Sequence, residues 1–488
     1  MKQKISIDPI TRLEGHGRID LFLNEDGELA NAYLIIPELR GFEKFCEGRP
    51  VEEMPRITQR TCGVCPIAHH MAAAKAGDAV YNVEIPPTAK KLRELMYSAF
   101  FVADHATHFY ILGGPDFVVG PDAPKSERNI LGVVRKVGKE FGGKVMQLLK
   151  DNHEITAMIG GRFIHSVSAI VGGVSKPITE EERLAILERS LRSVEFAKES
   201  LALFDKIVLG NPVYVDMITS DAFAHQTYYM GLVDENNHVN FYDGKVRVVS
   251  PTGTELVKYG PDEYLDVIAE HLEPWTYLKF PYLKAIGWKG FVDGEDSGVY
   301  RASPLSRLNV SDGMATPEAQ AMYEKFFDTL GGKPVHSTLA THWARLIEIL
   351  YAAERAVELA SDETITDPNV HTIPTETPSE GIGIVEAPRG TLTHHYKTDE
   401  RGLVQAVNLI VGTTNNYAAM DMSIVKAAKD LIKAGQEITD AALNKIEMAF
   451  RAYDPCMGCA THAQPGETPL KIMLYDHNHN LIDERQRD

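Results

Sequence analysis

The sequence predicts an α+β fold, in which a bundle of long helices occupies the middle of the chain and β-sheet regions lie towards both ends. Residues 17–37 alternate apolar and polar side chains, as strands do. Residues 87–114 and 179–208 instead repeat their apolar side chains about every 3.6 positions, which is typical of helices. Strand-like alternation returns in residues 381–416. Helices flanked by sheet, rather than a regular βα repeat, therefore define the fold class.

Length and charge limit the class of protein further. The chain has 488 residues, of which 44% are apolar and 24% are charged, and it is too long for a single hydrophobic core. Its 68 acidic and 50 basic residues give a formal charge of −18. Such a surface repels phosphate backbones, so we expect no nucleic-acid partner.

We expect a cytoplasmic protein. No run of about 18 apolar residues predicts a membrane span. The first residues, "MKQKISIDPITRLEGHGRID", lack the apolar segment of a signal peptide. Five cysteines are too few for a disulfide scaffold in a chain of this length, which favours a reducing compartment.

The N-terminal strands and the first two long helices carry clear local signals. Asp26-Gly27 predicts the turn of an N-terminal hairpin. Gly113-Gly114 ends the first helix. Its predicted buried face consists of Leu92, Leu95, Met96, Ala99, Ala103, Ala106 and Tyr110. The second helix begins with an acidic turn, which suits the helix dipole. Its predicted buried face consists of Leu184, Leu187, Leu191, Val194 and Leu201.

The second half of the chain is mixed. Residues 210–320 predict short strands and loops, residues 337–361 a further helix, and residues 381–416 a hairpin. Two helices follow, the second capped at Thr439 or Asp440. The expected regions are a β-rich segment (1–60), a helical bundle (61–210), a mixed insertion (211–325), a second helical segment with a connector (326–380), a hairpin with C-terminal helices (381–462) and a tail (463–488).

Two Cys-x-x-Cys pairs stand far apart in the chain. "RTCGVCPIAHH" carries Cys62 and Cys65, and "DPCMGCATH" carries Cys456 and Cys459, about 390 residues later. A small zinc module pairs its cysteines within about 20 residues, so this spacing argues against one. Four thiolates can still hold structural zinc, an iron–sulfur cluster or a soft-site metal such as nickel, and ligand chemistry alone leaves these options open.

The fifth cysteine and the flanking polar residues are less specific. Cys46 is typical of a small buried apolar side chain. Glu14, in "TRLEGHGR", and Glu43, in "RGFE", are by themselves typical of solvated surface. Arg389, on the Pro-Arg-Gly turn of "EAPRG", is by itself typical of a turn or interface cation.

Together these motifs resemble the large subunit of a nickel–iron hydrogenase along essentially the whole chain. The matching segments, in the family's order, are "RLEGH", "RGFE", "RTCGVCPIAHH", "DHATHFY", "GGRFIH", "EAPRG", "VGTTNN" and "DPCMGCATH". The respiratory complex I relatives share this fold but lack the four cysteines. The resemblance therefore implies the hydrogenase large-subunit fold and H2 chemistry.

The resemblance implies a nickel–iron centre held by the cysteines. Cys62 and Cys456 would bind nickel alone, whereas Cys65 and Cys459 would bridge it to an iron that carries one CO and two cyanides. The implied reaction is reversible heterolytic oxidation of H2 to two protons and two electrons. Pro388 and Thr413 match positions near the diatomic ligands.

The resemblance also assigns the surrounding polar residues. Arg389 matches the arginine above the open metal position, where it acts as base or as electrostatic partner, and Asp104 matches the carboxylate that orients it. Glu14 matches a proton relay that starts at Cys456. His69 matches a histidine that tunes a bridging cysteine.

A second metal site is implied near the C-terminus. Glu43 and His462 match its ligands. Magnesium is the usual ion, but imidazole is a poor magnesium ligand, which leaves iron as an alternative.

Subgroup, partners and processing follow from the same resemblance. Residues 69–95 and "DPCMGCATH" are most similar to the cytoplasmic, cofactor-coupled group, in particular its F420-non-reducing branch, which is associated with heterodisulfide reductase. NAD(P)-linked bidirectional enzymes and sulfhydrogenases are alternatives, and so is an H2-sensing regulatory hydrogenase. The expected partners are an iron–sulfur small subunit, which takes up the electrons, and a flavoprotein or heterodisulfide-reductase-type acceptor.

The residues after His462 resemble a maturation tail. We expect an endopeptidase to remove residues 463–488 by a cut near His462. We also expect the tail to hold the site open for nickel until it is removed.

Overall fold

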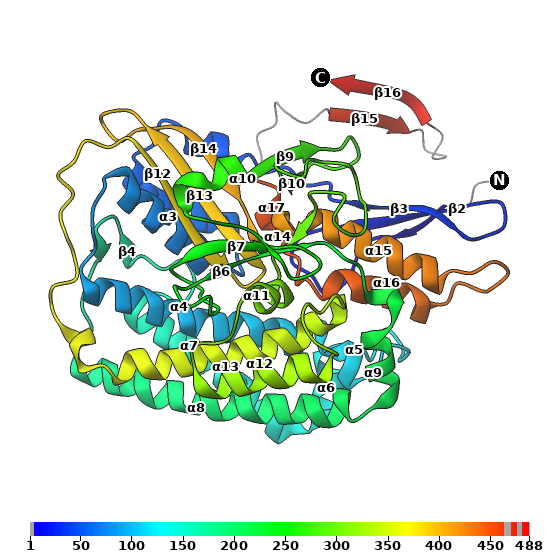
Figure 1. The fold of residues 1–488 in the computed structure, drawn as a ribbon, viewed down its shortest axis with the longest axis horizontal. Helices are drawn as coiled ribbons and strands as arrows, with labels where there is room; N and C mark the ends of the chain where they lie inside the picture. The colour runs from blue at the N-terminus through cyan, green and yellow to red at the C-terminus, as the bar shows by residue number, and fades with distance from the viewer. Residues whose placement is uncertain (1–3, 463–469, 476–480, 488) are drawn as a thin grey trace.

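The computed structural model describes residues 4–462, 470–475 and 481–487, and it confirms the α+β class. Long helices form one side of the molecule, and the sheets and the short helix α17 lie above them (Figure 1). The principal helices are α3 (Pro66–Val80), α4 (Pro87–Thr107), α6 (Ile130–Val137), α7 (Lys139–Gly160), α8 (Glu180–Phe204), α9 (Pro212–Thr219), α11 (Pro304–Val310), α12 (Pro317–Thr329), α13 (Thr341–Ser361), α15 (Tyr417–Leu431), α16 (Asp440–Arg451) and α17 (Met457–Ala460).

Short sheets, antiparallel except for the parallel pairing of β11 with β6, lie above this helical layer (Figure 1). The N-terminal sheet contains β1 (Lys4–Ile7), β2 (Arg18–Leu23) and β3 (Leu29–Ile35). The insertion contributes β6 (Tyr228–Val233), β7 (Lys245–Val249), β8 (Glu255–Tyr259), β9 (Ile268–Leu272), β10 (Lys279–Leu283) and β11 (Tyr300–Arg301). The sheet nearest the site contains β12 (Glu380–Ala387), β13 (Gly390–Thr398) and β14 (Val404–Ile410), so the predicted hairpin gains a third strand.

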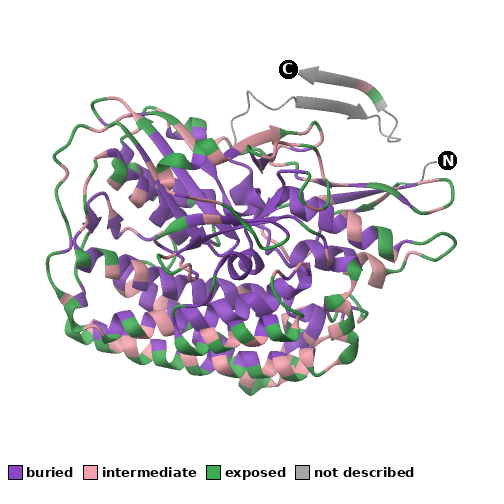
Figure 2. Ribbon diagram, viewed as in Figure 1, coloured by how far each residue is buried: buried purple, intermediate pink, exposed green. Residues whose placement is uncertain are grey.

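Helix α4 lies in the interior, as its periodicity predicts. All seven predicted apolar positions are buried. The helix continues into a π-helical turn at His108–Gly113, directly before the predicted stop at Gly114. Such turns often occur where a helix must re-aim side chains at a functional site. The interior that surrounds α4 and α13 is buried almost throughout (Figure 2).

The predicted buried face of α8 was wrong. Leu184 and Leu191 are 51% and 50% exposed, and of the predicted residues only Leu201 is fully buried. The buried face instead consists of Arg183, Ile186, Ser190, Ser193, Phe196, Ala197, Ser200, Leu201 and Phe204. Small side chains on this face let α8 pack closely between α7 and α13. Leucine periodicity alone therefore pointed to the wrong side of the helix.

Helix α3 lies directly on the sheet that precedes the second cysteine pair. A Cβ on Gly383 of β12 would come within 2.2 Å of the Ala72 carbonyl oxygen in α3. Only glycine permits this approach of helix backbone to strand backbone. The close packing brings the first turns of α3 against β13.

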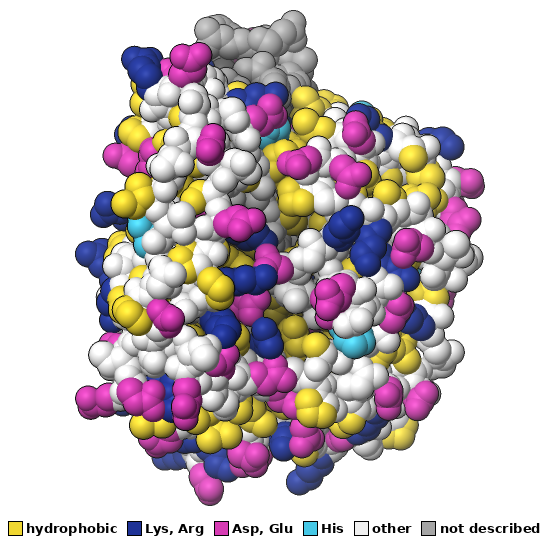
Figure 3. Space-filling view, turned by 60° about the vertical axis from the view of Figure 1, so that its left-hand side comes forward, with side chains coloured by type: hydrophobic (Ala, Val, Ile, Leu, Met, Phe, Trp, Pro, Cys, Tyr) yellow, Lys and Arg dark blue, Asp and Glu magenta, His cyan; other side chains and the backbone are white. Residues whose placement is uncertain are grey.

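Residues 210–320 contain the predicted short strands and loops, but also the helices α9 and α11, which the sequence analysis did not predict. Several other predictions for local structure hold. The Asp26-Gly27 turn connects β2 to β3, and the Thr439 hydroxyl caps α16 by accepting a hydrogen bond from the Ala442 N–H at 3.2 Å. Cys46 is fully buried. Acidic and basic side chains are interspersed on the face in Figure 3. Among the described residues, no helix is long and apolar enough to cross a bilayer.

Candidate metal centre

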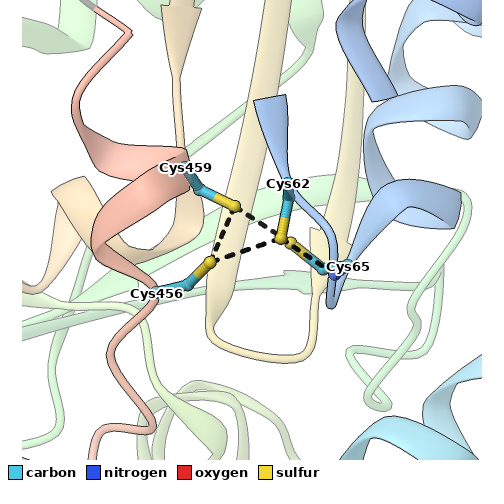
Figure 4. Close-up of side chains that lie close together, drawn as sticks. All are labelled: Cys62, Cys65, Cys456 and Cys459. Atoms are coloured by element: carbon cyan, nitrogen blue, oxygen red, sulfur yellow. Dashed lines mark hydrogen bonds between the residues drawn. The ribbon is translucent and has the colours of Figure 1, made fainter. Parts of the chain in front are cut away.

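The four paired cysteines meet in one buried cluster (Figure 4). The Sγ atoms of Cys62 and Cys456 lie 3.3 Å apart, as do those of Cys65 and Cys459. Cys456 and Cys459 lie 2.9 Å apart, and the ligand atoms of all four lie within 4.8 Å of one another. No pair forms a disulfide. The two ends of the chain therefore build one four-thiol site.

Local structure turns each pair inward. Cys65 stands at the N-terminus of α3, and Cys456 at the N-terminus of α17. The Cys62 sulfur accepts hydrogen bonds from the backbone N–H groups of Val64 at 3.2 Å and Cys65 at 2.9 Å. Helix N-termini and backbone N–H groups both stabilise negative sulfur.

Glu14 lies against the second cysteine pair. Its Oε2 is 3.0 Å from the Cys456 sulfur and accepts a hydrogen bond from the Gly458 N–H at 2.8 Å. The adjacent Gly15 has a φ of +83°, and a Cβ there would lie 2.8 Å from the Met457 Cβ. Glycine at this position is what lets the Glu14 segment approach α17 so closely.

Arg40 joins the two cysteine motifs, a role that the sequence reasoning missed. Its guanidinium donates to the Thr61 carbonyl at 2.7 Å and to the Gly458 carbonyl at 3.0 Å. Its own backbone N–H donates to the Thr461 carbonyl at 2.7 Å. One side chain thus connects the residue before Cys62 to the part of α17 between Cys456 and Cys459.

The thiols do not share one protonation state. Burial raises the pKa of Cys459, and the same effect, reinforced by the neighbouring thiols, raises that of Cys456. Burial opposes ionisation of Cys62 too, but contacts with the other three thiols and the charge of Arg389 hold its pKa well below the usual range. Only part of the cluster therefore ionises unless a cation neutralises the sulfurs.

Arg389 is buried beside the sulfurs and is held by two carboxylates. Its Nη1 lies 3.2 Å from Asp104 Oδ2, as the resemblance implies, and its Nη2 lies 2.9 Å from Asp454 Oδ2. Despite burial, which lowers it, these carboxylates raise the pKa of Arg389 well above its usual value. The guanidinium is a fixed positive charge next to the thiols.

Asp454 was not identified from the sequence, although it directly precedes the Pro455-Cys456 step. Its backbone φ is +55°, a region that aspartate tolerates better than most residues. Its Oδ1 lies 2.8 Å from His108 Nδ1. Burial raises the pKa of Asp454, but Arg389 and His108 outweigh that effect and lower it. Burial, together with the Asp454 charge, raises the pKa of Asp104 to about 7.

Pro388 and Thr413 line the same region. The Pro388 carbonyl accepts a hydrogen bond from Arg307 at 3.0 Å. The Thr413 hydroxyl oxygen accepts one from the Cys456 N–H at 3.1 Å, so the hydroxyl proton remains available. Thr413 is buried.

His69 lies one helical turn after Cys65, on the same side of α3. It is fully buried, and burial lowers its pKa to about 4. Its Nδ1 lies 3.0 Å from His394 Nε2, and its Nε2 contacts no polar partner among the described residues.

Glu43 and His462 also come together. His462 Nε2 lies 3.5 Å from Glu43 Oε1 and 2.5 Å from the Leu409 carbonyl oxygen. His462 Nδ1 lies 2.7 Å from the Cys459 carbonyl oxygen. Glu43 Oε1 accepts a hydrogen bond from the Leu409 N–H at 2.9 Å. Both side chains are buried.

The expectation that the tail keeps this site open until it is removed stays a prediction, because residues 463–469, which begin the tail, lie outside the described residues. His462 is buried and the four cysteines are already together in a chain that continues past residue 462. The contacts that close the site come from Arg40, Glu43 and Leu409, all upstream of the tail. Residues 470–475 and 481–487 form two strands that pair with each other. The bond expected to be cut joins His462 to residue 463, which lies outside the described residues.

The donor set fits a soft, redox-active metal. Four buried thiols in mutual contact match the preference of nickel and of iron for sulfur ligands. A buried guanidinium, a carboxylate against one sulfur and a partnerless imidazole nitrogen, all among the described residues, surround them. A purely structural zinc site would need none of these three groups.

Comparison with known proteins agrees with this chemistry. A family model described as nickel-dependent hydrogenase matches residues 40–130 and 216–462, and a HoxL-like model matches residues 4–39. An iron-sulfur subunit of the F420-non-reducing hydrogenase of Archaeoglobus profundus is 46% identical over 98% of this chain and 99% of its own length. The beta subunit of the NAD-reducing hydrogenase HoxS of Cupriavidus necator is 38% identical over 100% of both chains.

A solved structure shows the same fold. The crystal structure of an NAD+-reducing nickel–iron hydrogenase in the H2-reduced state superimposes with a TM-score of 0.88 and 38% identity, over 94% of this chain and 99% of that chain. The chain therefore belongs to the nickel-dependent hydrogenase family. It is the catalytic large subunit of a nickel–iron hydrogenase, and it is more similar to the F420-non-reducing relative than to the NAD-reducing ones.

Proposed function

We propose that Cys62, Cys65, Cys456 and Cys459 hold a nickel–iron centre at which H2 is oxidised reversibly to two protons and two electrons. The observation that carries the proposal is the four-thiol cluster beside the buried Arg389 guanidinium. Cys62 and Cys456 would bind nickel alone, and Cys65 and Cys459 would bridge nickel and iron. A centre of this kind supplies the soft Lewis acidity and the redox capacity for heterolytic H2 cleavage.

The iron is proposed to carry one CO and two cyanides. The Thr413 hydroxyl is a suitable partner for a cyanide nitrogen, because its oxygen is occupied by the Cys456 N–H and its proton is free. Pro388 presents an apolar ring without an N–H in the same lining. The Thr413 hydroxyl thus offers a hydrogen-bond donor at this position, whereas the Pro388 ring offers none.

Arg389 is proposed to act as a fixed cation rather than as the proton acceptor. Two carboxylates stabilise the charged guanidinium, so releasing its proton would cost more than in water. A preorganised charge of this kind stabilises electron density that develops at the reacting centre.

Glu14 is proposed to move the proton that leaves the site. Its Oε2 lies 3.0 Å from the Cys456 sulfur, within the reach that proton transfer requires. The side chain is only partly buried, so it connects the buried thiol with the outside. Protonated Cys456 and ionised Glu14 would exchange one proton per transfer.

Glu43, His462 and the Leu409 carbonyl are proposed to bind a second cation. Only a doubly protonated His462 could donate to both carbonyl oxygens that its ring nitrogens face. A cation bound to Nε2, the Leu409 oxygen and Glu43 would satisfy all three groups. Carboxylate and carbonyl oxygens suit magnesium, and the imidazole keeps iron as the alternative.

Electrons are proposed to leave through a face next to Cys62. Of the five cysteines, four form the cluster and Cys46 lies apart, so this chain has no cysteine set for an iron–sulfur relay. The exit face, defined as Arg60, Val64, Arg162, Phe163 and Ile164, consists of residues close in the chain to Cys62 or to His165. Its apolar members are 37–48% exposed, and His165 forms a hydrogen bond with the Cys62 backbone.

An iron–sulfur small subunit is the proposed occupant of the exit face. An apolar and basic surface near a buried redox site suits a partner with apolar and acidic contacts. Phe163→Glu should release that partner during purification of the native complex. Leu131→Glu, at a leucine on α6 that is 65% exposed against 48% for Phe163, is the control and should retain it.

The acceptor beyond the small subunit is proposed to be a heterodisulfide-reductase-type or flavoprotein component. The higher identity to an F420-non-reducing relative favours the first. A maturation endopeptidase is proposed to cut near His462, and mass spectrometry of active protein should show loss of the 26 residues after it. Active, nickel-loaded protein of full length would rule out this processing.

The proposed function is tested by H2-dependent reduction of a low-potential dye with the native complex. Cys456→Ser should abolish the activity. Cys46→Ala, at a buried cysteine outside the cluster, should leave it intact. Equal activity of the wild type and Cys456→Ser would refute the assignment.

A further inference from the structure

A buried hydrogen-bonded chain runs away from the cluster through His69. His69 Nδ1 lies 3.0 Å from His394 Nε2, and His394 Nδ1 lies 2.6 Å from the Tyr396 hydroxyl. All three side chains are fully buried. His394 and Tyr396 are two positions apart on β13 and share one face of the strand. The chain exists because α3 packs directly on this sheet.

Tyr396, at the far end of the hydrogen-bonded chain, is a hydrogen-bond donor. Burial raises the pKa of Tyr396 well above its usual value, so the phenol keeps its proton. Burial also lowers the pKa of both histidines, so each ring carries one N–H. The hydroxyl of Thr58, the other polar neighbour of Tyr396, donates a hydrogen bond to the Met54 carbonyl at 2.7 Å.

Two proton arrangements satisfy this geometry. In the first, Tyr396 donates to His394 Nδ1, His394 donates from Nε2 to His69 Nδ1, and His69 carries its proton on Nε2. In the second, every bond is reversed, Tyr396 donates to Thr58, and His69 directs a bare lone pair from Nε2. The two arrangements differ at His69 Nε2, which carries a proton in the first and a lone pair in the second.

The surroundings of His69 Nε2 decide between them. This nitrogen is buried and has no polar partner among the described residues, and His69 lies one helical turn after Cys65 on α3. A lone pair facing thiolates is repelled, whereas an N–H facing them forms a charge-assisted hydrogen bond, the stronger kind. The first arrangement is therefore favoured.

We propose that His394 and Tyr396 are positioning residues that fix the tautomer of His69, so that its Nε2–H points at the cluster thiolates and lowers their electron donation. Neither residue touches the cluster sulfurs in any contact described above. Their effect passes through His69, in the way that partners of metal-binding groups tune a metal site. The inference rests on the proposed nickel–iron centre.

The chain offers a matched control on the neighbouring strand position. His395 Nδ1 lies 2.7 Å from the Tyr264 hydroxyl, which is the same pair of groups in the same kind of contact. Its Nε2 lies 2.6 Å from Glu380. His395 stands between His394 and Tyr396 and points to the opposite face of β13.

The test is infrared spectroscopy of the anaerobically isolated holoenzyme in the CO and cyanide region. Losing the N–H contact makes a thiolate a better donor, which increases back-donation to CO and lowers its stretching frequency. Tyr396→Phe and His394→Leu should shift the CO band to lower wavenumber. His394→Gln, which keeps an N–H donor near Nε2, should restore the wild-type position.

The outcomes separate this inference from the function that supports it. Tyr264→Phe and His395→Gln should leave the bands unchanged. Unchanged bands in both Tyr396→Phe and His394→Leu would overturn the inference, as would equal shifts in the control pair. Absence of the bands from the wild type would instead reject the nickel–iron centre. If His394→Leu takes up no metal, Tyr396→Phe still decides the question.

Discussion

Replacing Asp454 by asparagine should damage the site more than the same change at Asp104. Both carboxylates hold Arg389, at 2.9 Å for Asp454 and 3.2 Å for Asp104. At an effective dielectric of about 20, a unit charge pair at such distances is worth roughly 5–6 kcal/mol. Asparagine keeps an oxygen acceptor and avoids burying a charge, and both effects offset part of the lost charge-pair energy. We therefore expect a net loss of about 3 kcal/mol for Asp454→Asn.

The effect at Asp104 should be smaller, because burial and the Asp454 charge raise the pKa of that carboxyl. Asp104→Asn should therefore remove less negative charge than Asp454→Asn. A loss of about 3 kcal/mol in the transition state corresponds to about a 100-fold lower rate. H2-dependent dye reduction at pH 7 should show this for Asp454→Asn and less than about a tenfold loss for Asp104→Asn.

Two controls accompany the comparison of Asp454→Asn with Asp104→Asn. Nickel content should be measured for both variants, so that failed assembly is not counted as lost turnover. Asp421→Asn, at a buried aspartate that accepts a hydrogen bond from the Leu34 N–H and makes no contact with the cluster, serves as the control and should retain full activity. A larger loss in Asp104→Asn than in Asp454→Asn would refute the assignment of the principal charge to Asp454.

Further expectations concern stability, proton transfer and the second metal. Burial raises the pKa of Asp421 to about 7, so the folded state binds its proton more tightly than the unfolded state and stability falls as pH rises from about 4 to about 7. Asp421→Asn should therefore raise the melting temperature at pH 8 but not at pH 4, and the gain in stability at pH 8 should be on the order of 4 kcal/mol. Asp116→Asn should lower the melting temperature at pH 8, because Arg451 and Arg12 lower the pKa of Asp116 although burial raises it. A change of the same sign in Asp421→Asn and Asp116→Asn would contradict this expectation. Glu14→Gln should slow dye reduction while the infrared bands stay in place, and unimpaired turnover would exclude Glu14 as the relay. Glu43→Gln should lose the second cation but keep nickel, as elemental analysis can show, and an unchanged metal content would exclude the site.

Sequence patterns predicted the fold class and the two cysteine pairs, whereas the resemblance to the hydrogenase family supplied the other expected site residues, which by themselves carry only surface or turn signals. The cysteine pairs, Glu14, Asp104, Arg389, Glu43 and His462 were all identified in advance, and the structure brings each to its expected neighbour. Cys-x-x-Cys spacing and a Pro-Arg-Gly turn are visible without tertiary contacts.

The features that sequence reasoning missed depend on contacts between distant segments. Asp454 resembles a helix-end residue until Arg389 is placed beside it, and Arg40 resembles a surface cation until Thr61 and Gly458 both face it. The α8 face was misassigned because its buried side includes the small polar residues Ser190, Ser193 and Ser200 beside its apolar ones. Close helix packing selected those residues, and no hydropathy pattern marks them.

Elemental analysis of the native protein, isolated without oxygen, tests the central claim most directly. Nickel and iron should be found together in this chain, with about one nickel for each set of four cysteines, and the nickel should be lost in Cys62→Ser. Stoichiometric zinc without nickel in native protein would contradict the claim, because the four thiols would then hold a structural metal and no H2 chemistry.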